Sequence, residues 1–285
     1  MPRRTSPRRP TSRRPRTSGS AAGATSAGCA APSFRRSRST RCPPRIGRAE
    51  GRVKALLVDL DDTLLDYSSG VDESWVESCA ALAAPAGVDP EALVAAIARR
   101  CRRFWDDPDR QRRERVDMTS AWRKITAHAL ADIGAPDDAL AAAIAGDFAA
   151  RRWECMELFP GVRDALDRLR QRRVSLALVT NGDRRHQRRK IEQHDLARFF
   201  DVILIEGEFG VGKPEEAVYR HALDSLEARP SEAWMVGDHL EWDVAAPQRL
   251  GLRGIWVDAH GQGLPEASPV MPHRIIRAFP ELLSD

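Results

Sequence analysis

Residues 55–64 read ALLVDLDDTL, so a short apolar run leads directly into a cluster of carboxylates. An apolar run of this length between polar residues predicts a strand that is buried on both faces of a sheet. Such a strand would deliver Asp59 and Asp61 to the rim of the sheet. Two carboxylates two residues apart can divide roles, one as nucleophile or metal ligand and the other as general acid and base. The alternative is a buried strand that ends in an ordinary polar turn, where Asp is common.

The charge of the chain is unevenly distributed. The 285 residues carry a net charge of +4 and are enough for one large domain or two small ones. Residues 1–50 contain 13 Arg, no Lys and one Glu, which gives this segment a net charge of +12 and leaves −8 for the remainder. The basic character therefore belongs to the N-terminal segment, and the rest of the chain is mildly acidic.

Residues 1–52 are rich in Arg, Ser, Thr, Pro and Ala and poor in aliphatic residues, which predicts a disordered basic tail. Three interpretations stay open: an organelle transit peptide, a basic arm that binds nucleic acid, and translated upstream sequence before a true start near Val53. We expect a cytoplasmic protein, with organelle import only if the tail is a genuine transit peptide. No apolar run is long enough to span a membrane, and the five Cys form no zinc or disulfide pattern.

A long region after the first strand carries only helical signals. Asp89 and Pro90 predict a helix start, because Asp caps helices and Pro fits their first position. Further helices are predicted near residues 121–133 and from Pro136 to Trp153. The whole region, residues 67–157, is therefore predicted to be an all-helical domain inserted after the first strand. The core domain would comprise residues 53–66 and 158–285.

Strands and helices then alternate towards the C-terminus. Strands are predicted at residues 174–179, 202–205, 233–236 and 254–257, and we take the last of these as the final strand. This alternation predicts an α/β fold with a doubly wound parallel sheet. Ligands of such sheets bind beyond the carboxyl ends of the strands, so the residues directly after each strand are candidates for the site.

The residues at these strand ends suit phosphate chemistry. Thr180 and Asn181 follow one predicted strand, Asp238 and Asp243 follow another, and Lys213 precedes a predicted helix. Acids, a hydroxyl group and a lysine on one rim would suit a divalent cation and a phosphoryl group. Oxygen ligands favour Mg²⁺ over Zn²⁺. Each motif alone is also common in ordinary turns and loops.

Together these motifs resemble those of the haloacid dehalogenase superfamily of hydrolases, and the resemblance covers about residue 53 to the C-terminus. The motifs are, in order, Asp59-Leu60-Asp61-Asp62-Thr63, Thr180-Asn181, Lys213, and Gly237-Asp238 with Asp243. The resemblance implies a Rossmann-like core, a helical cap in place of the insert, Mg²⁺ as cofactor and an aspartyl-phosphate intermediate.

The resemblance also implies a role for each motif residue. Asp59 would be the nucleophile, and Asp61 would act as general acid and then as general base. Lys213 would neutralise charge on the nucleophile and the phosphate. Phosphoryl oxygens would be bound by Thr180, Asn181 and Lys213. The metal would be held by Asp59, the backbone carbonyl of Asp61, Asp238 and Asp243, the last as a ligand or as a support for the ligands.

Position 61 separates the branches of the superfamily. Its dehalogenases lack the second Asp because a departing halide needs no proton, so Asp61 points to a phosphatase of a small phosphorylated metabolite. A phosphomutase of the same superfamily is one alternative, and a non-catalytic nucleic-acid-binding protein that uses the Arg-rich tail is another. We expect no membrane association and no nucleic-acid partner for the enzyme, and the sequence does not indicate an oligomeric state.

The insert combines aromatic and basic residues. It contains four Trp and, between residues 99 and 115, eight Arg beside Phe104 and Trp105. Arginines beside aromatic rings could grip a nucleotide or a second anionic group. The alternative is a solvated Arg-rich helix face over a small Trp-containing core. His239 stands where relatives more often have a smaller polar residue, and it would either contact the substrate or shield the metal loop.

Overall fold

The computed structural model describes residues 53–284, so the tail predicted for residues 1–52 lies outside the described residues. Its main feature is a six-stranded, all-parallel sheet in the order β5-β4-β1-β6-β7-β8. The strands are β1 (Ala55–Val58), β4 (Ser175–Thr180), β5 (Val202–Ile205), β6 (Ala233–Gly237), β7 (Arg253–Val257) and β8 (Arg274–Ile276). The predicted doubly wound parallel sheet is confirmed.

Strand β1 is central and buried on both faces, as its apolar run predicts. Leu56 and Val58 belong to one hydrophobic cluster, and Ala55 and Leu57 belong to another. Because successive side chains of a strand point to opposite faces, each cluster covers one face of the sheet. The carboxylates beyond β1 therefore lie at the middle of the rim.

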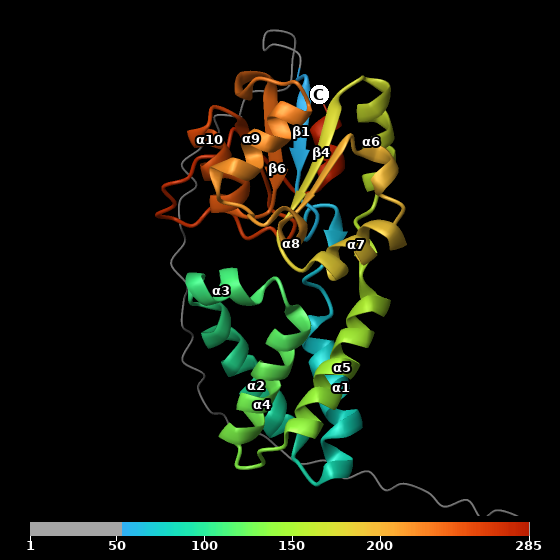
Figure 1. Ribbon diagram of the computed structural model, residues 1–285, viewed down its shortest axis with the longest axis vertical. Coiled ribbons are helices and arrows are strands. Elements are labelled where there is room, and N and C mark those ends of the chain that lie inside the picture. The colour runs from blue at the N-terminus through green and yellow to red at the C-terminus, as the bar shows by residue number, and fades with distance from the viewer. Residues whose placement is uncertain (1–52, 285) are drawn as a thin grey trace, which may run out of the picture. The chain divides into compact units, whose positions relative to one another are not determined.

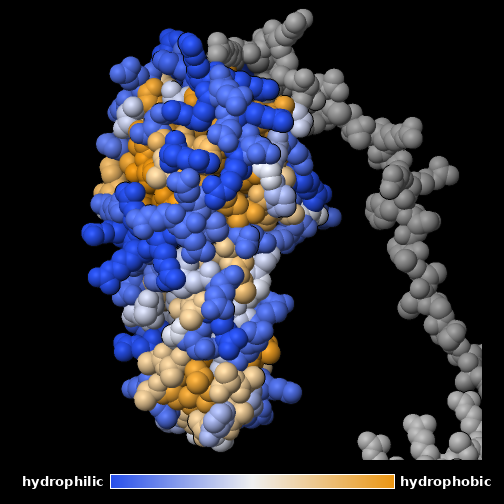
Figure 2. Space-filling model, turned by 90° about the vertical axis from the view of Figure 1, so that its right-hand side faces the viewer, coloured by the Kyte–Doolittle hydropathy of each residue, from blue (hydrophilic) through white to orange (hydrophobic). Residues whose placement is uncertain are grey.

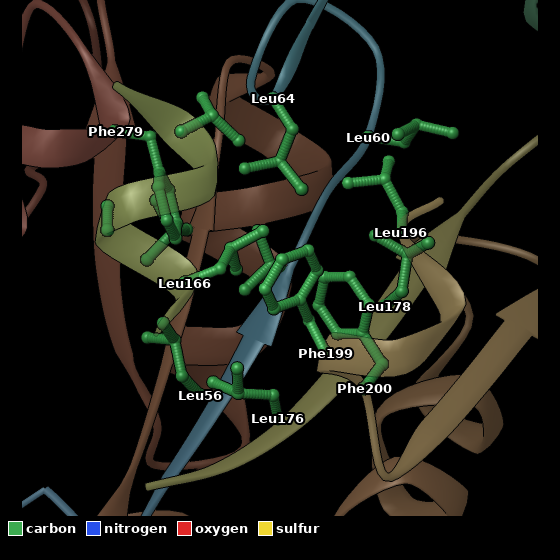
Figure 3. Packing of buried hydrophobic residues seen from close by; sticks show 14 of the residues in the cluster. Leu56, Leu60, Leu64, Leu166, Leu176, Leu178, Leu196, Phe199, Phe200 and Phe279 are labelled. Carbon is green, nitrogen blue, oxygen red and sulfur yellow. The ribbon is translucent and has the colours of Figure 1, made fainter. Parts of the chain in front are cut away.

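Helices cover both faces of the sheet (Figure 1). One face packs against α6 (Val162–Gln171) and α7 (Arg184–Gln193), and the other against α9 (Glu216–Ser225) and α10 (Ala246–Arg249). Figure 3 shows the first cluster, in which Phe199, Phe200 and Phe279 lie among leucines from the strands and α6. Hydrophilic residues cover much of the molecular face that carries α6 and α7 (Figure 2).

The region between Asp66 and Glu157 is helical, as predicted. Its helices are α1 (Val71–Leu82), α2 (Pro90–Trp105), α3 (Pro108–Glu114), α4 (Met118–Asp132) and α5 (Asp138–Cys155). Asp89 caps α2 by accepting hydrogen bonds from the Glu91 and Ala92 N–H groups. The helices share a core of their own, in which Trp75 stacks on Phe148 with ring centroids 3.6 Å apart.

Two short antiparallel strands lie where the chain leaves the sheet for the helical region and where it returns. Strand β2 (Leu65–Asp66) pairs with β3 (Glu157–Leu158), with Leu65 opposite Leu158. The Phe159 N–H also donates to the Leu64 carbonyl at 2.9 Å. The sequence predicts no strand here, because two residues are too few for an alternating pattern.

One prediction near the C-terminus is wrong. The strand predicted at residues 254–257 is not the last one, because β8 comes after it and pairs in parallel with β7. Its three residues come after a loop rich in Pro and Gly and show no period of their own. The segment after β6 is helical: it begins as a π-helix, η4 (Leu240–Ala245), and continues into the short α10.

Shorter helical segments complete the described chain: α8 (Glu206–Phe209), η1 (Ala84–Ala86), η2 (Ala197–Phe199), η3 (Pro230–Glu232) and η5 (Phe279–Leu283). Within residues 53–284, no helix has both the length and the apolar character needed to cross a membrane.

Candidate active site

The seven predicted site residues line one cavity. Asp59 and Asp61 lie just beyond β1, Thr180 ends β4, and Asp238 lies just beyond β6. They meet because the carboxyl ends of parallel strands share one rim of the sheet. Asn181, Lys213 and Asp243 join them from the loops and from η4.

Lys213 lies between two of the carboxylates. Its Nζ is 2.6 Å from Asp59 Oδ1 and 2.7 Å from Asp243 Oδ1, and the residue is 1% exposed. Burial disfavours the ammonium ion, but the charges of Asp243 and Asp59 outweigh it and raise the pKa of Lys213. The ammonium group therefore keeps its proton and stabilises the carboxylate form of Asp59.

Three carboxylates form a group that fits a divalent cation. One carboxylate oxygen from each of Asp59, Asp238 and Asp243 lies within 4.8 Å of the others. Burial, with the charges of neighbouring acids, raises the pKa of Asp59 to about 7 and that of Asp238 to about 9. Crowded buried carboxylates need more positive charge than Lys213 alone supplies, and hard oxygen ligands suit Mg²⁺. The donor set therefore fits the predicted cofactor.

The backbone around η4 places Asp243. The His239 N–H donates to Asp243 Oδ2 at 3.0 Å. A Cβ atom at Gly237 would lie 2.3 Å from the Asp243 carboxyl group, so only glycine leaves room for it. His239 Nδ1 accepts a hydrogen bond from the Trp242 N–H at 3.2 Å, its ring stacks on Trp242, and burial lowers its pKa. His239 thus supports the loop that carries Asp238 and Asp243, and it also lines the cavity.

Asp61 is held apart from the acid cluster by two residues of α7. Lys190 Nζ lies 2.8 Å from both of its carboxylate oxygens, and Gln187 Nε2 donates to Oδ2 at 2.9 Å. The Lys190 ammonium also lies 4.1 Å from the centroid of the Tyr67 ring. Sequence reasoning missed Lys190 and Gln187. Two signals could have found them: their spacing of three places them on one helix face, and Lys190 is one of only four lysines in this arginine-rich chain.

Thr180 and Asn181 lie in one corner of the cavity, where their side chains are hydrogen-bonded to Gln187 and to the Lys213 backbone. Gln187 Nε2 donates to Thr180 Oγ1 at 2.6 Å. The Asn181 side chain donates to the Lys213 carbonyl at 2.8 Å and accepts from the Lys213 N–H at 2.7 Å, so it fixes the lysine backbone. The role of Thr180 and Asn181 in binding phosphoryl oxygens stays a prediction, and the Asn181 amide group is engaged with Lys213.

Arg115 links the helical region to this corner. Its guanidinium donates to both carboxylate oxygens of Glu206, at 2.7 and 2.6 Å, and to the Lys213 carbonyl at 3.2 Å. Glu206 Oε2 also accepts from the Gly182 N–H at 2.9 Å. The side chains of Arg115 and Glu206 are only 11% and 6% exposed. Glu206 comes directly after β5, so the rule about strand ends could have identified it.

The other arginines of the 99–115 run do not line the cavity. Arg100 pairs with Asp132, and Arg110 lies over the Phe104 ring within the helical region. Arg112 makes an exposed pair with Glu215 at 3.7 Å. These contacts support the interpretation of this run as a largely solvated face, with Arg115 as the exception.

Replacing Arg115 should destabilise the protein strongly. Arg115→Ala leaves the Glu206 carboxylate buried without its cation, and removal of one partner from a buried pair costs about 3 kcal/mol or more. The free energy of unfolding, measured by urea denaturation, should fall by this amount. Hydrogen exchange of the α3 amides should become faster, because the helix loses its anchor on the sheet domain.

The matched control is Arg112→Ala, which removes a neighbouring arginine from an exposed pair with the sheet domain. Exposed pairs contribute less than about 1 kcal/mol, so this variant should unfold almost like the parent. Equal losses in the two variants would contradict the anchoring role of Arg115.

Comparisons with known proteins identify the family of this chain. A family model described as haloacid dehalogenase-like hydrolase matches residues 53–251. The chain is 33% identical over 245 residues to a phosphoserine phosphatase from Thermus thermophilus, which covers 76% of this chain and 94% of that protein. It is 31% identical over 238 residues to N-acylneuraminate-9-phosphatase from Rattus norvegicus, which covers 81% and 92%.

A solved structure gives the same result for the fold. The 2-haloacid dehalogenase from Pseudomonas syringae pv. Tomato matches with a TM-score of 0.56 and 28% identity, over 81% of this chain and 96% of that chain. The family match covers most of the described residues and all seven predicted site residues. The chain therefore belongs to the haloacid dehalogenase-like hydrolase family, and it is an enzyme of the phosphoric monoester hydrolase type.

Proposed function

We propose that this enzyme is a Mg²⁺-dependent phosphatase that hydrolyses a small phosphorylated metabolite through an aspartyl-phosphate on Asp59. The observation that carries the proposal is that the Asp59 and Asp61 carboxylates have different surroundings. Asp59 lies against Lys213 within the acid cluster, whereas Asp61 lies outside it and pairs with Lys190. One carboxylate is thus placed for attack and the other for proton transfer. The phosphatase names of the two relatives reported above support the proposed phosphatase activity.

In the first step, a carboxylate oxygen of Asp59 attacks phosphorus. A bond from Asp59 to phosphorus forms while the ester P–O bond breaks. Asp61, in its acid form, gives its proton to the departing alcohol oxygen. Lys213 contributes by keeping Asp59 ionised and by balancing charge as two anions approach each other.

In the second step, the Asp61 carboxylate takes a proton from water, and the resulting hydroxide attacks phosphorus. The bond between Asp59 and phosphorus breaks, phosphate leaves, and Asp59 is a carboxylate again. Lys190 and Gln187 orient Asp61 for this exchange through their hydrogen bonds.

Asp59, Asp238 and Asp243 would hold the metal, with the backbone carbonyl of Asp61 as a further ligand. When bound, Mg²⁺ would screen the negative charges of the nucleophile and the phosphoryl group. Raised pKa values at Asp59 and Asp238 support this assignment, because they show how poorly the metal-free cluster tolerates its own charge.

We also propose that residues 67–157 act as a cap over a catalytic core of residues 53–66 and 158–285. The shared cavity supports this division, because residues from both parts line it. A cytoplasmic location is a further proposal. The described cysteines Cys79, Cys101 and Cys155 are unpaired, which suits a reducing compartment.

The nucleophile assignment predicts different fates for two conservative variants. Asp59→Asn should lower kcat by about 1,000-fold or more, because it removes the attacking oxygen with little change of shape. Asp61→Asn should lower turnover by roughly 100-fold or more but still accept a phosphoryl group from p-nitrophenyl phosphate, whose leaving group needs no proton. Intact-protein mass spectrometry should then detect one added phosphoryl group.

Substantial steady-state turnover by Asp59→Asn would rule out the assignment. Release of inorganic phosphate is the companion measurement, because a phosphomutase converts its substrate without net phosphate release. A dehalogenase would instead release halide from a haloacid and leave phosphate esters intact.

Stabilisation by Mg²⁺ should increase with pH. Burial raises the pKa of Asp59 and Asp238, so the metal-free fold binds their protons more tightly than the unfolded chain does. These groups therefore lower its stability as pH rises from about 4 towards about 7 and about 9. Since Mg²⁺ binds the ionised forms, the rise in Tm on adding Mg²⁺ should be larger at about pH 8.5 than at about pH 6.

Differential scanning calorimetry measures this shift. Asp243→Asn is the control, because it removes one carboxylate of the cluster and should reduce the Mg²⁺ effect at both pH values. A Tm shift that is independent of pH in the parent protein would contradict the metal assignment.

A further inference from the structure

The cavity above the catalytic residues is unusually aromatic. It has a volume of about 420 Å³, and seven of its lining residues outside the rim motifs are large aromatic side chains. These are Tyr67, Trp75, Trp105, Trp122, Phe148, Trp153 and Trp242. Six come from residues 67–157 and Trp242 comes from η4, so aromatic surface faces the catalytic residues from both parts of the enzyme.

The cations that line this cavity beyond the catalytic group are already paired. Arg115 is committed to Glu206 and the Lys213 carbonyl. Arg152 is buried, donates to the Ser69 carbonyl at 2.7 Å and also donates to the Tyr67 carbonyl. A substrate with a carboxylate or a second phosphate would therefore have to displace an existing partner of a buried arginine. Such a substrate gains little and leaves a buried charge without its partner.

Besides His239, whose ring stacks on Trp242, His186 is the remaining lining residue outside the catalytic group that could carry a positive charge. Its Nδ1 lies 2.8 Å from Asp183 Oδ1. Its ring stacks on Trp153 and meets the Trp122 ring edge-on, with centroids 5.5 Å away in each case. Packed in this way, His186 adds a flat ring to the aromatic surface and its charge partner is Asp183.

We propose that the substrate is a phosphate monoester of an alcohol that carries an aromatic ring and no second charge, and that the ring lies among these aromatic side chains. This inference rests on the phosphatase function proposed above. Aromatic rings stack on one another and bury apolar surface, whereas a polyol or an amino acid would lose water and meet mostly aromatic surface or polar groups that are already paired. The volume lies near the lower end for small-molecule sites, which limits the substrate to one or two rings beside the phosphate.

Trp105 is the best residue for a test. It ends α2, is partly exposed and meets the Phe104 ring edge-on with centroids 4.9 Å apart. Trp75 and Phe148 stack inside the core of the helical region, so their loss would disturb folding as well as binding. Val76, on α1, is 50% exposed and does not line the cavity, which makes Val76→Ala a control for a change in the same region.

The first experiment compares phenethyl phosphate with ethyl phosphate on the full chain with Mg²⁺. Both have similar alkyl leaving groups, so the ring is the only relevant difference between them. The ring should raise kcat/KM by roughly 10- to 100-fold, the range expected for burying such a group. O-phosphoserine, which carries further charges, should be hydrolysed less efficiently than phenethyl phosphate.

A preference for O-phosphoserine, or equal rates for the phenethyl and ethyl esters, would overturn the aromatic assignment and leave the phosphatase function intact. Failure to hydrolyse every ester, including p-nitrophenyl phosphate, would overturn the proposed phosphatase function. The inference is then decided by binding alone: isothermal titration calorimetry with Asp59→Asn should show phenethyl phosphate binding at least about tenfold more tightly than ethyl phosphate. Equal affinities would overturn it.

The second experiment places the ring. Trp105→Ala should lower the ratio of kcat/KM for phenethyl over ethyl phosphate by about tenfold, because the lost contact involves only the leaving group. Trp105→Phe should restore most of the ratio, and Val76→Ala should leave it unchanged. An unchanged ratio in Trp105→Ala, with the protein still folded by circular dichroism, would overturn the proposed placement of the ring.

Discussion

The buried ammonium group of Lys213 connects the parts of the catalytic centre. Its side chain contacts Asp59 after β1 and Asp243 in η4, two carboxylates that would otherwise repel each other away from water. Its backbone is fixed by both hydrogen bonds to the Asn181 side chain. Segments at the ends of three different strands are thus held at one point. The charge that stabilises the Asp59 carboxylate also holds these segments together.

The same backbone position connects the helical region to the site. Arg115 donates to the Lys213 carbonyl and to Glu206, and Glu206 accepts from the Gly182 N–H beside Asn181. The docked position of the helical region and the loop after β4 are therefore parts of one hydrogen-bonded network. Movement of the helical region away from the sheet would break the Arg115 bonds to Glu206 and to the Lys213 carbonyl. The position of the helical region and the order of the loop after β4 are therefore coupled directly, through Arg115 and Glu206.

Much of the fold and of the candidate site could be predicted because strand signals and strand-end residues are local. The carboxylates after β1 and β6 lie directly beyond buried apolar runs. Glu206 follows β5 in the same way, so inspection of strand ends could have identified it too. The sequence could not single out Arg115 among eight similar arginines, because its role depends on how α3 meets the sheet domain. The pairing of Lys190 with Asp61 joins positions 129 residues apart, and three residues of β8 are too short to show a period. These features are set by tertiary contacts that leave little trace in neighbouring residues.

The β2–β3 pair has an evolutionary consequence. Leu65 lies opposite Leu158, so the chain leaves the sheet domain and re-enters it at adjacent points, about 5 Å apart by the usual spacing of paired strands. A segment whose two ends lie side by side can be exchanged for one of another length without rethreading the strands. The catalytic rim can then be inherited unchanged while the intervening module diverges. Replacement of this single contiguous segment would change the lining of the cavity and leave the strand-end residues in place.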